Sequence, residues 1–146
     1  MNFRPVSDFI QEVLVEEKGV PGCDVQICRS HEVLYQETFG ARNYTKTEPA
    51  RRDDIYFLYS CTKPITCAAG AGYGYGLGVR TLVDCSEGQR SSLGEFGWDG
   101  AAGSYVMIDP KHQLSIVFAM HVKNWPTLIG CGHAPIRDMS YDILGL

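Results

Sequence analysis

The hydrophobic and polar positions follow a helical period at the start of the chain. Acidic and amide side chains separate the apolar positions, and a glycine and a proline follow the last of them. The apolar residues at the spacing of one helical stripe are Val6, Phe9, Ile10, Val13 and Leu14. This pattern predicts an amphipathic helix with one face packed on the rest of the protein.

The period then changes to two. Residues 24–29 alternate polar with apolar side chains, and residues 32–39 follow after a short polar connection, so the two runs predict a β-hairpin. Residues 43–54 are charged and aperiodic, and a surface loop is expected there. The apolar residues 55–58 predict a short buried segment, a strand or the lead into a helix, before the next element.

The middle of the chain is rich in small residues. Residues 60–67 predict a short helix, and the alanine and glycine tract 68–72 predicts a joint. Residues 72–78 alternate glycine with larger side chains and lead into strand-like patterning up to residue 83, where glycine indicates close backbone approach. A dinucleotide-binding glycine loop is disfavoured, because its third glycine is misplaced and the order of strand, loop and helix is absent.

The last third predicts two β-rich runs and a helix. The runs cover residues 94–108 and 114–122, and Asp109-Pro110 between them opens a tight turn. After Pro135, apolar residues at Ile136, Met139 and Ile143 have helical spacing, so a second amphipathic helix is expected.

Together these elements read helix, two strands, short helix, three strands, helix. We therefore expect one α+β domain over residues 1–146, with a roughly five-stranded antiparallel sheet, the N- and C-terminal helices on one face and the short helix on the other. One short helix cannot cover a whole face, so exposed apolar surface is expected near the joint.

Composition narrows the classes of function. The chain is 45% hydrophobic and 21% charged, with a formal net charge of −4 and no basic run. Nucleic acid and membranes are therefore not expected as partners, and no apolar run is long enough to span a bilayer. The first residues lack the pattern of a secretion signal, so we expect a cytoplasmic monomer, or a secreted protein whose signal has been removed.

The 6 cysteines are scattered without a Cys-x-x-Cys pair, and none has zinc-finger spacing from the 4 histidines. We expect small buried apolar residues in a reducing compartment, with disulfides or a metal site as the less favoured alternatives. No cofactor and no metal ion are expected.

Ser60 and Lys63 stand at positions i and i+3, where an apolar run meets polar residues. On a helix these positions share a face, and the N–H groups at a helix start favour developing negative charge. A serine hydroxyl needs a neighbouring base to act as a nucleophile, and a neutral lysine amine can serve. A capping serine followed by a solvated lysine has the same spacing, so the pair alone decides little.

Three blocks in order resemble one enzyme family. Residues 57–66, Phe-Leu-Tyr-Ser-Cys-Thr-Lys-Pro-Ile-Thr, are similar to the nucleophile motif of the serine β-lactamases and penicillin-binding proteins, in particular the class C β-lactamase and family VIII esterase branch. Residues 75–78 resemble the glycine-rich strand of that branch. Residues 94–105 resemble the strand that carries its Lys-Thr-Gly or His-Thr-Gly triplet.

The resemblance implies a role for each matching residue. Ser60 matches the acylated nucleophile, and Lys63 matches the amine that deprotonates it. The backbone N–H groups of Ser60 and Trp98 match the oxyanion hole. The implied substrate-binding residues are Tyr59, Glu95, Phe96, Gly97, Asp99 and Gly100.

The chain also departs from the family. Residues 95–97, Glu-Phe-Gly, replace the triplet, so Glu95 would repel a substrate carboxylate, and residues 98–100, Trp-Asp-Gly, suggest neutral esters or amides. The family's helical region with its Tyr-x-Asn motif is missing, and the joint near residues 67–73 takes its place. Without that region, Lys63 would be more solvated than the matching lysine of the family and therefore a poorer base. Two tyrosines of the glycine-rich run could replace the missing one, although aromatic cover of the sheet is the favoured interpretation.

We therefore expect a serine acyl hydrolase of the β-lactamase/esterase type. It would act on an ester or amide, β-lactams included, through an acyl-serine intermediate, with turnover impaired by the missing region. The alternative is a non-catalytic isolated α/β core, either a truncation or a degenerate ligand-binding module.

Overall fold

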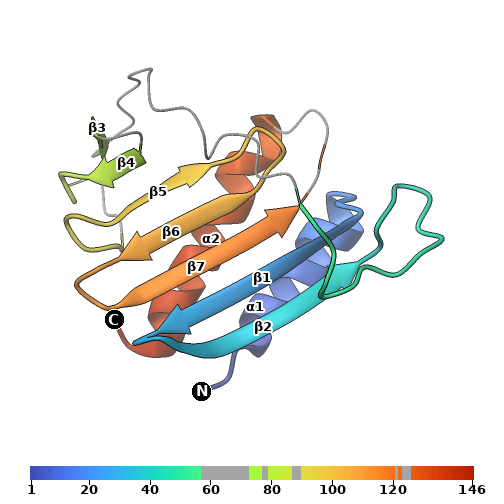
Figure 1. Cartoon of the computed structure of the whole chain (residues 1–146), viewed down its shortest axis with the longest axis horizontal. Coiled ribbons are helices and arrows are strands. Elements are labelled where there is room, and N and C mark those ends of the chain that lie inside the picture. The colour runs from blue at the N-terminus through green and yellow to red at the C-terminus, as the bar shows by residue number, and fades with distance from the viewer. Residues whose placement is uncertain (57–72, 77–78, 87–89, 121, 123–125) are drawn as a thin grey trace.

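The computed structural model describes residues 1–56, 73–76, 79–86, 90–120, 122 and 126–146. These residues form one antiparallel sheet with strand order β2-β1-β7-β6-β5-β4-β3, and both terminal helical segments cover the same face of it (Figure 1). The strands are β1 (Gly22–Arg29), β2 (Glu32–Gly40), β3 (Tyr73–Gly76), β4 (Val79–Leu82), β5 (Phe96–Asp99), β6 (Tyr105–Asp109) and β7 (Leu114–Met120). The helices are α1 (Arg4–Asp8), the π-helix η1 (Phe9–Glu17) and α2 (Pro126–Leu144). The α+β class is confirmed.

The predicted number of strands is wrong, because the described residues form a 7-stranded sheet. Two runs whose patterning predicts one strand each fold as pairs, β3 with β4 and β5 with β6. Between β5 and β6, the N–H of Gly100 donates to Ser104 O at 2.7 Å, and Gly103 has a φ of 90°. Glycine adopts a positive φ without a Cβ clash, so the chain can reverse inside one apparent strand.

The first helix buries a different stripe from the predicted one. Its second part is a π-helix, in which the N–H of Lys18 donates to Val13 O at 2.9 Å in the i→i+5 pattern. The wider turn moves the inward face from Val13 to Val15, which is 5% exposed. The fully buried residues of this segment are Val6, Ile10 and Leu14.

Both predicted hairpins are confirmed. β1 and β2 are joined by Ser30 and His31, whose φ values of 50° and 67° suit a type I′ turn. β6 and β7 pair on either side of the Asp-Pro turn. β7 also pairs with β1, so the N-terminal and C-terminal hairpins meet inside the sheet.

The hydrophobic core lies between the sheet and the helices. Alternate residues of each strand point to this side, as the pleat requires. The largest fully buried side chains are Tyr105, Tyr141, Phe118, Ile10, Leu14, Ile27, Leu82, Met107, Leu114, Ile116 and Met120. Most of these core residues therefore come from the N-terminal and C-terminal parts of the chain.

Other expectations differ from the structure or lie outside it. α2 begins at Pro126, a residue as well suited to a first helical turn as Pro135, which lies inside the helix. Ile55 is 89% exposed, so the buried approach predicted at residues 55–58 is wrong at its first residue. The short helix from residue 60 and the joint lie outside the described residues, apart from Tyr73, which begins β3.

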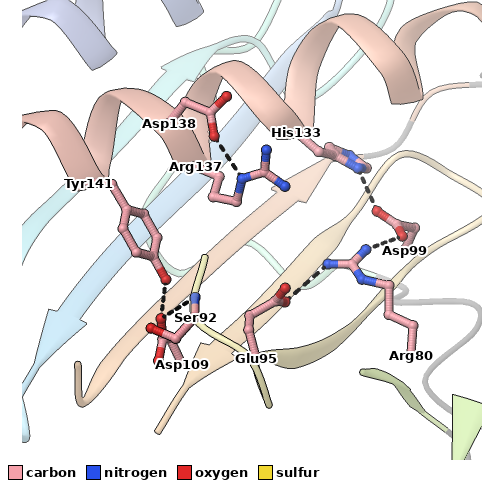
Figure 2. Close-up of polar contacts among 9 residues, drawn as sticks. All are labelled: Arg80, Ser92, Glu95, Asp99, Asp109, His133, Arg137, Asp138 and Tyr141. Carbon is pink, nitrogen blue, oxygen red and sulfur yellow. Dashed lines mark hydrogen bonds and ion pairs between the residues drawn. The ribbon is translucent and has the colours of Figure 1, made fainter. Parts of the chain in front are cut away.

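A buried carboxylate, Asp109, fastens the β6–β7 turn to α2 (Figure 2). It accepts hydrogen bonds from the Tyr141 hydroxyl and from the backbone N–H of Ser92 at 3.2 Å. The backbone N–H groups of Lys111 and His112 also donate to it, at 3.0 and 3.2 Å. Burial alone raises the pKa of Asp109, but the hydrogen bonds, with that from Tyr141 the strongest, lower it below its ordinary value.

Replacing Tyr141 by Phe removes this donor and keeps the ring. Because a hydrogen bond to a charged group contributes about 1.5–3 kcal/mol, we expect the free energy of unfolding to fall by that amount in urea denaturation at neutral pH. Tyr44→Phe is the control, since Tyr44 is 59% exposed, and it should change stability by less than about 0.5 kcal/mol. Equal stability of Y141F and the wild type would contradict the anchoring role of Asp109.

Candidate functional site

The predicted site residues divide between the described part of the chain and the rest. Tyr59, Ser60 and Lys63 lie outside the described residues, so their roles stay predictions. Residues 95–100, the remainder of the predicted set, lie together on β5 and its two flanking positions.

β5 turns part of this set toward the helices. Gly97 pairs with Met107, which is fully buried in the core, so both residues face the helix side of the sheet. Because side chains alternate along a strand, Glu95 and Asp99 point to the same side. The side chains of Glu95, Asp99 and a histidine of α2 meet there (Figure 2).

The two aromatic residues of β5 point to the opposite face. Phe96 lies across from Ile108 and Trp98 from Val106, and all four side chains are partly buried. The short nucleophile helix is expected on this face of the sheet.

Arg80 of β4 joins the two inward carboxylates (Figure 2). Its Nη1 lies 2.6 Å from Asp99 Oδ2, and its Nη2 lies 3.4 Å from Glu95 Oε1. His133 of α2 is bound to the other Asp99 oxygen, with Nδ1 2.7 Å from Oδ1, and its Nε2 lies 2.8 Å from Gly103 O. We call Arg80, Glu95, Asp99 and His133 the Arg80 cluster.

Because these groups are buried, each charge needs its partner to offset the cost of removing it from water. Glu95 is fully buried and the Arg80 side chain is 13% exposed, so either charge alone would carry a large desolvation penalty. Burial alone raises the pKa of Asp99, but the hydrogen bond from His133 and the charge of Arg80 lower it below its ordinary value. The Arg80 guanidinium also lies 5.2 Å from the ring centroid of Tyr105, within range of a cation–π contact.

The partners of His133 decide which of its nitrogens carry hydrogen. A backbone carbonyl and an ionised carboxylate can only accept hydrogen bonds, so both ring nitrogens must donate. The ring is stacked on Tyr105, with centroids 4.7 Å apart, and meets Phe118 edge-on at 6.3 Å.

Two predicted substrate contacts need correction. The carboxylate of Glu95 faces Arg80 in the interior, so it is not available to repel a substrate carboxylate. Asp99 likewise uses its two carboxylate oxygens for Arg80 and His133. Both corrections follow from strand alternation, which turns these side chains away from the face that carries Phe96.

The N–H of Trp98, the predicted oxyanion donor, faces β6. Leu82 N–H donates to Glu95 O at 2.7 Å, and Arg80 pairs with Gly97 in the same register. Hydrogen-bonded pairs alternate along an antiparallel ladder, so the N–H of Gly97 points to β4 and that of Trp98 points to β6. The geometry therefore does not favour Trp98 as a donor to a ligand.

The next N–H along the strand belongs to Asp99 and points to the β4 side. Arg80↔Gly97 is the last pair between β4 and β5 among the described residues. In this register the position opposite Asp99 is residue 78, which lies outside the described residues.

The two glycines of the predicted set have structural roles. A Cβ on Gly97 would overlap the carbonyl oxygen of Val106, so β5 and β6 approach closely here. Gly100 closes the loop to β6 by its hydrogen bond to Ser104. These reasons for glycine hold without any ligand.

The sequence patterns did not identify Arg80 or His133 as residues of the site. Arg80 stands in a short strand between Val79 and Thr81, and His133 precedes the helical stripe that begins after Pro135. The available signal was the two acidic positions 95 and 99, since two carboxylates on a buried strand face need positive partners on neighbouring elements.

A surface pocket of about 170 Å³ lies at the end of the β1–β2 hairpin, away from the Arg80 cluster. Arg42 and Asp54 line it and form an ion pair at 2.8 Å. Within the described ranges, no three His, Cys, Asp or Glu side chains are grouped to hold a metal ion. None of the helices in these ranges has the length and apolar character needed to cross a membrane.

No protein-family model and no curated protein matches the chain. The resemblance to the serine β-lactamases and esterases therefore depends on the three sequence blocks.

Replacing Asp99 by Asn removes the charge held by Arg80 and His133. We expect the free energy of unfolding to fall by about 1.5–3 kcal/mol at neutral pH. Because the folded-state pKa is lowered, this stabilisation is complete above the unfolded value of about 3.9 and is lost as the pH falls below it.

Urea denaturation from neutral pH down to about pH 3 should show the difference between the wild type and D99N closing at the acid end. Asp53→Asn, in the exposed loop, is the control and should stay within about 0.5 kcal/mol of the wild type. A difference that is constant across the pH range would rule out the charge as its cause.

Proposed function

We propose that the chain is the α/β part of a serine acyl hydrolase of the β-lactamase/esterase type, forming an acyl ester on Ser60 from an ester or amide. The observation that supports this best is the fit between the sequence blocks and the sheet. The third block, residues 94–105, folds as β5 and the loop that leads into β6, and residues 75–76 of the glycine-rich block form the end of β3 in the same sheet. Helices cover one face of this sheet (Figure 1). By the strand register, the aromatic side chains of β5 lie on the other face.

In the proposed reaction, Lys63 accepts the hydroxyl proton of Ser60 while Oγ attacks the carbonyl carbon. The bond to the alcohol or amine then breaks, the leaving group takes up that proton, and an acyl-Ser60 ester remains. Water hydrolyses the ester to a carboxylic acid and free Ser60. The second step is expected to be slow, because the sequence lacks the Tyr-x-Asn region that would complete the proton relay.

The carbonyl oxygen gains negative charge during the attack and needs preorganised donors. We assign these to the backbone N–H groups of Ser60 and Asp99, in place of Trp98, because the ladder directs the N–H of Trp98 to β6. Loss of one such donor typically lowers the rate by about 10²- to 10³-fold.

The charge distribution favours a neutral substrate. Arg80 pairs with the carboxylates of Glu95 and Asp99 inside the protein, and His133 is hydrogen-bonded to Asp99, so neither carboxylate is presented on the outer face. The aromatic residues of β5 would offer apolar contact to an acyl group. We therefore favour neutral esters over anionic β-lactams.

A non-catalytic core is the second candidate. The Arg80 cluster favours it, because a closed set of ion pairs stands where the family has a cation and a hydroxyl for its substrate. In that case the protein would keep the sheet and the helices but would not form an acyl enzyme.

Labelling with a fluorophosphonate tests the enzyme directly, since Ser60 Oγ would displace fluoride and form a stable phosphonate ester. We expect one label per chain, mapped to Ser60 by peptide mass spectrometry and absent in Ser60→Ala. Lys63→Ala should slow labelling by about 10²-fold or more, because the general base is lost.

Ser86→Ala is the matched control, since Ser86 is exposed and bonded to Asp84, and it should label like the wild type. Hydrolysis of p-nitrophenyl acetate should be slow and should disappear with S60A. Equal labelling of S60A and the wild type would refute the role of Ser60, and absence of all labelling would favour the non-catalytic core.

A further inference from the structure

We draw no further inference here: the strongest candidate, the surface pocket at the end of the β1–β2 hairpin, has the guanidinium of Arg42 already paired with Asp54 and Glu48, and nothing among the described residues shows what ligand would fill it.

Discussion

Carboxylates on the buried side of the sheet require partners, and this requirement organises the half of the protein formed by β4, β5 and α2. Glu95 and Asp109 are fully buried. A charge in such a place is tolerated when cations or several donors surround it. Arg80 must therefore face inward from β4, His133 must reach down from α2, and the β6–β7 turn must stay against Tyr141. The position of α2 on the sheet follows from these contacts as much as from its apolar stripe.

The same requirement gives β5 two separate tasks. Its inward side carries ion pairs and a glycine that allows the close approach of β6. Its outward side carries Phe96 and Trp98 next to Ile108 and Val106. Residues that are adjacent in the sequence thus serve stability and proposed ligand contact in turn. Asp99 ends the strand, and its side chain belongs to the inward set.

Local signals made part of this structure predictable. The Asp-Pro turn and the alternating runs gave both hairpins, because a turn and its strands are close in sequence. The strand number was not predictable, since glycine lets the chain reverse inside one β-rich run. The candidate site was predictable in its residues but not in their orientation: which alternate set of β5 faces inward depends on Met107 and on Arg80, which belong to other strands.

The adjacency of β1 and β7 has a consequence for how such a chain can change in length. The strands that carry most of the core come from the two ends of the chain, and they pair directly with each other. The chain between them includes β2 to β6, which extend the same sheet on both sides of this central pair. The entropy of closing a connection between two strands depends on the logarithm of its length, about 0.6 kcal/mol for each doubling. A longer or shorter connection between strands therefore costs the central β1–β7 pair little.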